Sequence, residues 1–153
     1  MSDDYFIMGV DPGISGALAF YNPKFPQLIA AYDMPVVGNK ELNAAELFDI
    51  IDSFKPVVAV VEVVHAMPKQ GVSSSFNFGV SYGVIRGVVG ASKIRTHLVA
   101  PTKWKRYFSL DADKEASRAL AIRHWPDSPH FRRKKDHGRA EAALLALYGN
   151  AIK

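Results

Sequence analysis

Short apolar runs in the first half of the chain predict β-strands. Three of them follow one another, at residues 5–11, 16–22 and 28–34. Turn residues separate the first two at Pro12-Gly13, and a proline-containing loop precedes the third. A fourth run, residues 57–64, is apolar and β-branched except for Glu62, which is typical of a strand that is covered on both faces. We expect this fourth strand to lie centrally, next to the first.

Residues with helical spacing follow these strands. After Asn43, apolar residues recur at helical intervals, and Glu46 stands where it would complete a capping box with Asn43. This pattern predicts a helix from Asn43 to about Ser53. The later elements that we expect are a strand at 96–100, helices at 101–108, 114–125 and 138–152, and an exposed loop at 125–135.

Glycines recur at three- and four-residue intervals in the segment 76–91, at Gly79, Gly83, Gly87 and Gly90. In a helix they would form one face of small residues, which lets another backbone approach closely at some cost in helix propensity. Two interpretations stay open. The face packs against the core, or it contacts a second copy of the chain.

Together these elements predict one α/β domain that spans residues 1–153. Strands come first and strand–helix alternation follows, which indicates a mixed sheet flanked by helices. No apolar stretch approaches the ~20 residues that a membrane span needs. The first residues also lack the basic segment of a secretory signal. We therefore expect a soluble protein without membrane association.

Composition narrows the chemistry. The formal net charge is +4, but residues 93–139 alone contain 13 Lys and Arg against 5 Asp and Glu. A surface this basic attracts polyanions, of which nucleic acid is the commonest. The chain has no cysteine, so any metal would be held by oxygen or imidazole ligands. Such ligands favour hard cations such as Mg²⁺ or Mn²⁺.

Two acidic residues stand at the ends of predicted strands. Asp11 follows the first strand in VDPG, and Glu62 lies in the apolar fourth run. An Asp-Pro-Gly turn is common, so a structural role for Asp11 stays open. Glu62 has no basic residue near it in sequence before Lys69, which favours a functional role.

Three further polar residues surround the start of the last predicted helix, in KKDHGRAEAALLAL. Glu141 lies among alanines and leucines, which favours a functional role. His137 and Glu141 are four residues apart and would share one helix face. His137 is a candidate metal ligand, general base or surface histidine. Asp136 either caps the free amides of the helix or reaches a metal from the loop.

Acids brought together from such distant positions repel one another unless cations neutralise them. Two divalent ions about 4 Å apart can activate a water and stabilise the leaving oxygen in phosphodiester cleavage. The sequence therefore predicts a nuclease site with two Mg²⁺ ions, for which Mn²⁺ could substitute. Its expected ligands are Asp11, Glu62, Asp136 and Glu141, with Asp11 bridging the ions.

Basic and aromatic residues outside this site are candidates for DNA contact. Lys105 is expected to bind phosphate, while the neighbouring indole of Trp104 packs in the core or stacks on a base. Lys114, at the start of a helix, is expected to stabilise charge on a phosphate near the metals. His65 begins a loop close to the site. The other candidates are Met67, Lys69, Gln70, Phe76, Lys103, Arg106, Arg132, Arg133, Lys134 and Lys135.

Three blocks of the sequence together resemble a known family: VDPGISGALAF, VVEVVHAMPKQGVSSSFNFGVSYGVIRG and KKDHGRAEAALLALYG. Their order and spacing, from about residue 5 to 148, are similar to those of the RuvC-type Holliday junction resolvases, in particular the phage and prophage branch. The resemblance implies an RNase H-like fold with a mixed five-stranded sheet, a homodimer, and Mg²⁺-dependent paired nicks in a four-way DNA junction. It also implies a site of action in the cytoplasm of a bacterium or a phage-infected cell.

The resemblance assigns roles by position. Asp11 matches the first-strand aspartate of the family, Glu62 the glutamate of its central strand, and Glu141 the aspartate of its last helix. Lys105 and Lys114 fall near the two lysines that the family uses at the junction.

Two positions depart from the family pattern. Three residues before the final acid the family has Asp or His, and here Gly138 stands there, so the fourth ligand is either Asp136 or His137. The family often has an aromatic wedge soon after its glutamate. Here that place is His65, and Met67 and Phe76 are further candidates for opening the junction.

One alternative function stays open. Because a glutamate replaces the final aspartate and the fourth ligand is displaced, the chain could be an RNase H-like dimer that binds branched DNA without cutting it.

Actin-like and sugar-kinase phosphotransferases also begin with an Asp-x-Gly turn. They need two such domains and a second phosphate loop, for which this chain is too short.

Overall fold

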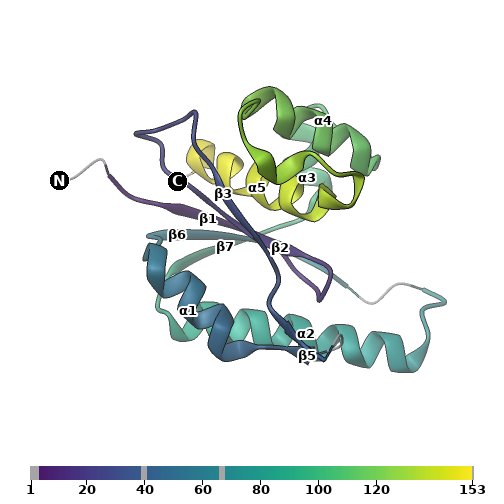
Figure 1. Ribbon diagram of the computed structural model, residues 1–153. Coiled ribbons are helices and arrows are strands. Elements are labelled where there is room, and N and C mark those ends of the chain that lie inside the picture. Colours follow the sequence, from purple (N-terminus) through teal and green to yellow (C-terminus); the bar gives the residue numbers. More distant parts are fainter. Residues whose placement is uncertain (1–3, 39–40, 66–67, 153) are drawn as a thin grey trace.

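A mixed five-stranded sheet forms the middle layer of the protein (Figure 1). The structure, a computed structural model, describes residues 4–38, 41–65 and 68–152. Strand β1 (Ile7–Asp11) is paired antiparallel with β2 (Ala17–Tyr21) and parallel with β6 (Val58–Glu62). The predictions of a mixed sheet and of a central fourth strand next to the first are therefore confirmed. In sheet order the strands are β3 (Ala30–Asp33), β2 (Ala17–Tyr21), β1 (Ile7–Asp11), β6 (Val58–Glu62) and β7 (Arg95–Val99).

Helices cover both faces of this sheet (Figure 1). On one face lie α1 (Ala44–Phe54) and α2 (Val72–Ala91). On the other lie α3 (Pro101–Tyr107), α4 (Lys114–His124) and α5 (His137–Ile152). The α/β layer architecture thus follows the prediction. Among the described residues, no helix is both long and apolar enough to cross a membrane.

Most element boundaries agree with the sequence pattern, and the cap of α1 does so in detail. The side chain of Asn43 accepts a hydrogen bond from the backbone N–H of Glu46 at 3.1 Å. Helix α2 begins at Val72, four residues before the predicted start, because the polar first turn carries no apolar periodicity. Smaller elements that the pattern did not reveal are the hairpin β4 (Val36–Val37) with β5 (Glu41–Leu42) and the 3₁₀ turns η1 (Pro129–Phe131) and η2 (Lys134–Asp136).

Close packing of α5 against the sheet fixes the position of its N-terminal end. A side-chain carbon on Gly9, in the middle of β1, would lie 2.0 Å from the carbonyl oxygen of Ala142. The two backbones are thus in contact, and the small residues of α5 are buried against the strands. Since β1 ends at Asp11, this packing brings the start of α5 next to that residue.

The glycine face of α2 points away from the core. The residues that α2 buries are Ser81, Ile85 and Val89, on its opposite face. A side-chain carbon at Gly79, Gly83, Gly87 or Gly90 would meet no described atom within 4 Å. Within the described chain the interpretation as core packing is therefore wrong, and contact with a second copy stays a prediction.

Candidate metal centre

Asp11 and Glu62 emerge side by side from one edge of the sheet. Strands β1 and β6 are parallel, and their register pairs Val10 with Val61. The next residue of each strand is the acid, and each is the last residue of its strand. Because the carboxyl ends of parallel strands meet at the same sheet edge, the chain needs no special loop to bring these two carboxylates together.

Helix α5 adds Glu141 to this edge. A side-chain carbon on Gly138, in the first turn of α5, would lie 3.5 Å from Asp11 Oδ2 and 3.2 Å from the carbonyl oxygen of Ser15. The turn between β1 and β2 therefore lies close to the helix backbone, and a larger residue at position 138 would require Ser15 to move by a few tenths of an ångström. Glu141 follows almost one turn later and is 7% exposed.

Burial and mutual repulsion destabilise the charged forms of Asp11 and Glu62. Burial raises the pKa of Asp11 well above its usual value, and the charges of Glu141 and Glu62 raise it further. Burial also raises the pKa of Glu62, against the opposing effect of a hydrogen bond from Trp104. Nearby Lys105 and Lys114 lower both pKa values without cancelling the shift. The two lysines therefore offset only part of the cost of burying these carboxylates.

Two consecutive residues of α3 contact the other two acids. The indole Nε1 of Trp104 donates a hydrogen bond to Glu62 Oε2 at 2.7 Å. The ammonium of Lys105 lies 3.4 Å from Glu141 Oε2 and 5.5 Å from the centre of the Trp104 ring. Helix α3 thus fixes one carboxylate by a neutral donor and the other by a charged one.

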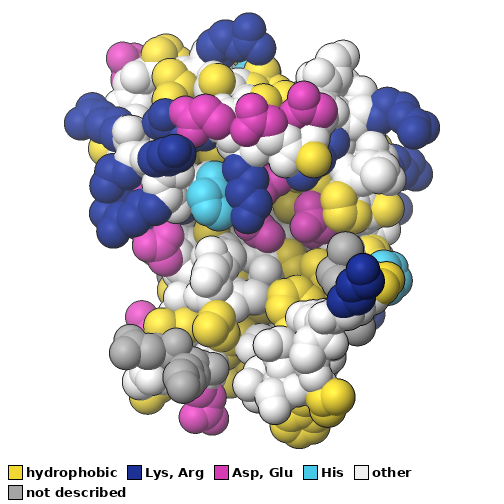
Figure 2. Space-filling model, turned by 90° about the vertical axis from the view of Figure 1, so that its right-hand side faces the viewer, with side chains coloured by type: hydrophobic (Ala, Val, Ile, Leu, Met, Phe, Trp, Pro, Cys, Tyr) yellow, Lys and Arg dark blue, Asp and Glu magenta, His cyan; other side chains and the backbone are white. Residues whose placement is uncertain are grey.

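A small cleft of about 210 Å³ opens beside Asp11. The turn between β1 and β2 forms one wall, and Phe78, Lys114 and His137 complete the lining. Figure 2 looks at the side of the molecule that lies at the right of Figure 1. There, basic and acidic side chains gather over α3, α4 and α5, whereas the lower half, over α1 and α2, is mostly uncharged.

The structure separates the two candidates for the fourth ligand. Asp136 is 3% exposed, and Arg133 donates to both of its carboxylate oxygens, from the backbone N–H at 2.9 Å and from the guanidinium at 2.9 and 3.1 Å. Burial raises the pKa of Asp136, but the hydrogen bonds from Arg133 and the charge of Arg139 outweigh it and lower the pKa. His137 instead lines the cleft beside Asp11, and its buried Nδ1 has no hydrogen-bond partner among the described residues.

The residues at this edge fit a hard divalent cation by their chemistry. They offer carboxylate oxygens that repel one another and a buried imidazole nitrogen without a partner. In the described part of the chain, however, no three His, Asp or Glu side chains are already arranged to hold a metal ion. Trp104 and Lys105 hold Glu62 and Glu141 instead. Metal binding at this site would therefore have to compete with Lys105.

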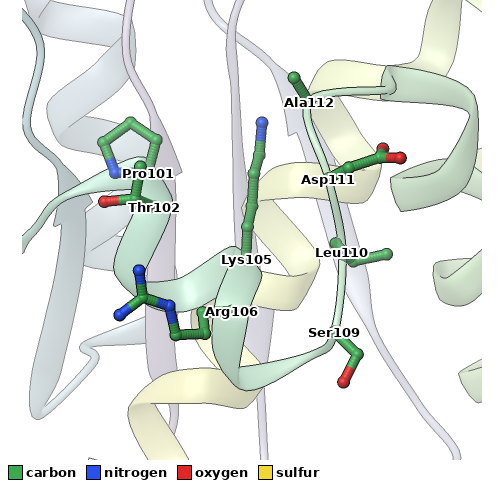
Figure 3. Close-up of a pocket in the computed structure, with 8 residues that line it drawn as sticks. All are labelled: Pro101, Thr102, Lys105, Arg106, Ser109, Leu110, Asp111 and Ala112. Carbon is green, nitrogen blue, oxygen red and sulfur yellow. The ribbon is translucent and has the colours of Figure 1, made fainter.

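A second, larger cleft of about 530 Å³ lies along α3 (Figure 3). Lys105 stands between its two sides, with Pro101 and Thr102 on one and residues 109–112 on the other, and Arg106 also lines it. Because Lys105 also contacts Glu141, this cleft lies next to the acids.

The remaining candidates for DNA contact are scattered over the surface. Gln70 lines a separate cleft with Ile14 and Phe78, two residues that also line the cleft of Asp11. Arg133 is exposed but is paired with Asp136. Met67 lies outside the described residues. The other candidates are all exposed: His65, Lys69, Phe76, Lys103, Arg132, Lys134 and Lys135.

The sequence did not reveal the role of two aromatic residues. Trp104 was expected to pack or to stack, and its hydrogen bond with Glu62 spans 42 positions of the chain. Phe78 lies in the glycine-rich segment and contributes to the cleft of Asp11. Neither contact has a local sequence signal, because each depends on how distant elements meet.

Comparisons with known proteins identify the fold. No protein-family model matches the chain, and no curated protein matches it. Among solved structures, Thermus thermophilus RuvC in complex with a Holliday junction substrate has a TM-score of 0.64 and 13% identity over 97% of this chain and 96% of that chain. The fowlpox virus resolvase, in complex with substrate Holliday junction DNA, has a TM-score of 0.56 and 16% identity, and covers 96% and 98%.

A third similar structure is the yeast mitochondrial Holliday junction resolvase Ydc2, with a TM-score of 0.56 and 13% identity. The match covers 92% of this chain and 75% of that chain. The structural neighbours are thus RuvC and other Holliday junction resolvases. The chain has their RNase H-like fold, as the sequence resemblance implied.

Proposed function

We propose that the chain is a Holliday junction resolvase, a structure-selective endodeoxyribonuclease that makes paired nicks in four-way or branched DNA. The observation that carries this proposal is the meeting of Asp11, Glu62 and Glu141 at one edge of a fold shared with three resolvases. Carboxylates that destabilise one another in the absence of a cation favour catalysis with a metal over a purely structural role.

In this proposal Asp11, Glu62 and Glu141 hold two divalent ions, Mg²⁺ or Mn²⁺, and His137 supplies the fourth ligand in place of Asp136. When bound, the ions would supply an activated water and stabilise the charge of the leaving oxygen. Asp11 is fixed by a central strand, which suits a bridging ligand. His137 is favoured because it lines the cleft of Asp11 and has a buried nitrogen without a hydrogen-bond partner among the described residues, whereas both oxygens of Asp136 are used by Arg133.

The basic side chains would hold the DNA backbone around this site. Lys114 lines the cleft of Asp11, where an ammonium offsets charge on the phosphate being cleaved. Lys105 and Arg106 line the adjacent cleft along α3. The exposed Lys134 and Lys135 of η2 would contact a second arm of the DNA junction. The DNA of a bacterium, and that of a phage that infects it, lies in the bacterial cytoplasm, so we expect the chain to act there.

We also propose that the chain acts as a homodimer through α2. Its outward face carries Phe76 and Val80, which are 70% and 50% exposed, together with the glycines that meet no described atom. An exposed apolar stripe of this kind favours a protein contact. Two sites in one dimer would account for paired nicks. Phe76 is equally available for opening the junction, and a dimer contact would bury it.

One assay tests the nuclease. The wild-type chain and Asp11→Asn are incubated with an end-labelled four-way junction and with linear duplex of the same sequence, in Mg²⁺, Mn²⁺ or Ca²⁺. We expect symmetric nicks near the crossover of the junction alone, from the wild type with Mg²⁺ or Mn²⁺. Asp11→Asn should still retard the junction in a gel but leave it uncut. Retardation by the wild type without nicks at any metal concentration would contradict the nuclease and support a chain that binds branched DNA without cutting it.

A further inference from the structure

The indole of Trp104 is fully buried and makes its hydrogen bond with a carboxylate. Its Nε1 donates to Glu62 Oε2 at 2.7 Å, at the short end of the range for N–H···O hydrogen bonds. An indole N–H can only donate, so this bond keeps one oxygen of Glu62 directed at the ring. The other oxygen, Oε1, is the one left for a cation.

Helix α3 holds this indole rigidly at the end of β6. The register of the parallel strands pairs Glu62 with Val99, the last residue of β7, and α3 begins two residues later at Pro101. A further hydrogen bond, from Val63 N–H to the carbonyl of Val99 at 2.8 Å, ties the ends of both strands together. The Trp104 ring also packs edge-on against Phe108, with ring centres 6.4 Å apart. Its donor therefore has a fixed position relative to Glu62.

A second buried tryptophan, Trp125, provides a comparison, because its indole N–H bonds to the backbone and not to an acid. Trp125 is equally buried, at 1% exposed, and its Nε1 donates to the backbone carbonyl of Pro26 at 3.1 Å. A carbonyl satisfies a buried indole without involving any acid. Trp104 instead bonds to one of the three acids of the candidate metal centre. From this contrast we infer that the N–H of Trp104 also orients the carboxylate of Glu62, besides having its own hydrogen bond satisfied.

We propose that Trp104 is the positioning residue of the metal centre. Its N–H holds Oε2 of Glu62 and leaves Oε1 as the oxygen for a cation, and it thereby sets the affinity of the centre for a divalent cation. The proposal rests on the proposed function in one respect, that Glu62 is a metal ligand. It adds a residue of α3 that would touch neither the metal nor the DNA.

The test compares Trp104→Phe with Trp125→Phe, since both remove one indole N–H and a similar ring volume. Binding of Mn²⁺ to each protein without DNA is measured by the electron paramagnetic resonance of the free ion. We expect Trp104→Phe to lose roughly 10-fold in Mn²⁺ affinity, the lower end of what loss of a partner to a metal ligand costs. Trp125→Phe should bind as the wild type does. In the nicking assay, Trp104→Phe should need about 10-fold more metal and recover most of its rate at saturation.

Equal Mn²⁺ affinity of the two variants would overturn the proposal and leave Trp104 as a packing residue. A wild-type chain that binds no Mn²⁺ would overturn it too, along with the metal centre. If Trp104→Phe does not fold, benzothienylalanine at position 104 keeps the ring shape and replaces the N–H with sulfur, and its affinity decides. A wild type that binds Mn²⁺ but makes no nicks contradicts the proposed nuclease, while the affinity ratio still decides the role of Trp104.

Discussion

Lys105 and Glu141 form an ion pair at the centre of the candidate site, with 3.4 Å between Nζ and Oε2. Their side chains are only 18% and 10% exposed, so solvent screens this pair weakly. Lys105 also lowers the pKa of both Asp11 and Glu62. In the absence of a metal its ammonium is therefore a counter-ion for the whole group of acids, and a divalent cation would compete with it.

The variant Lys105→Met should change stability and metal affinity in opposite directions. Without metal, removing the ammonium leaves Glu141 unpaired, which we expect to cost about 1–3 kcal/mol in the free energy of unfolding. Mn²⁺ should bind more tightly than to the wild type, because the competing cation is gone. Thermal denaturation with and without Mn²⁺ measures both effects. Lys103→Met, on the same helix but exposed, is the control and should change neither.

Asp11→Asn should stabilise the metal-free protein at neutral pH. The folded-state pKa of Asp11 is raised, so between its unfolded and folded pKa values the native state binds more protons, and stability falls as pH rises through that window. The neutral amide removes this penalty. We expect the melting temperature to rise by a few degrees at pH 7, since about 1 kcal/mol shifts it by roughly 2–4 °C in a domain of this size.

The gain from Asp11→Asn should disappear below the usual pKa of an aspartate, where the carboxyl of the wild type is protonated in both states. Saturating Mg²⁺ should also remove it, because the metal stabilises the wild type and not the variant. A gain that is constant over pH 3 to 8 would show that Asp11 carries no repulsion in the folded chain.

Replacing Asp136 and replacing His137 should have different effects, the first on stability and the second on Mn²⁺ binding. Asp136→Asn removes the negative charge and one of the two oxygens that accept from Arg133, and should cost about 1–3 kcal/mol of stability, because a buried NH2 group then faces a donor. The pKa of Asp136 is lowered in the folded state, so this contribution is present above its unfolded pKa and is lost from the wild type as pH falls. His137→Ala should instead leave the fold intact and weaken Mn²⁺ binding. The reverse result would make Asp136 the ligand.

The sequence predicted the parts of the site that depend on strand ends. Continuous apolar runs located β1 and β6, and parallel pairing then made Asp11 and Glu62 neighbours. It could not predict the contact between Trp104 and Glu62, nor that between Lys105 and Glu141, because both depend on how α3 docks. The choice between Asp136 and His137 was likewise undetermined, since adjacent residues at a helix start point in different directions.

The direction in which the α2 glycines face could also not be predicted from their spacing. Their spacing predicted a face of small residues, but periodicity alone does not say which face of a helix meets the core. In the structure Ile85 and Val89 are buried, and the glycines lie opposite. The apolar residues Phe76 and Val80 lie beside the glycines and are exposed in the single chain.

Gly83→Ala tests whether this face joins two copies of the chain. In a monomer the added methyl group meets no described atom, so the variant should be more stable by about 0.5–1 kcal/mol through its higher helix propensity. In a symmetric dimer the methyl groups of both copies would hold the helices apart. A steric cost of about 1.4 kcal/mol would weaken self-association roughly tenfold. Sedimentation equilibrium measures the dissociation constant and thermal denaturation the stability.

The control for that experiment is Asp49→Ala, an exposed change on α1 that should leave self-association unaltered. A variant Gly83→Ala that is stabilised and dimerises as well as the wild type would exclude close helix contact at this face. The exposed Phe76 would then be free for the junction, because no second copy would cover it. Weakened dimerisation with unchanged cleavage per dimer would instead assign the glycine face to assembly and leave the chemistry to the sheet edge.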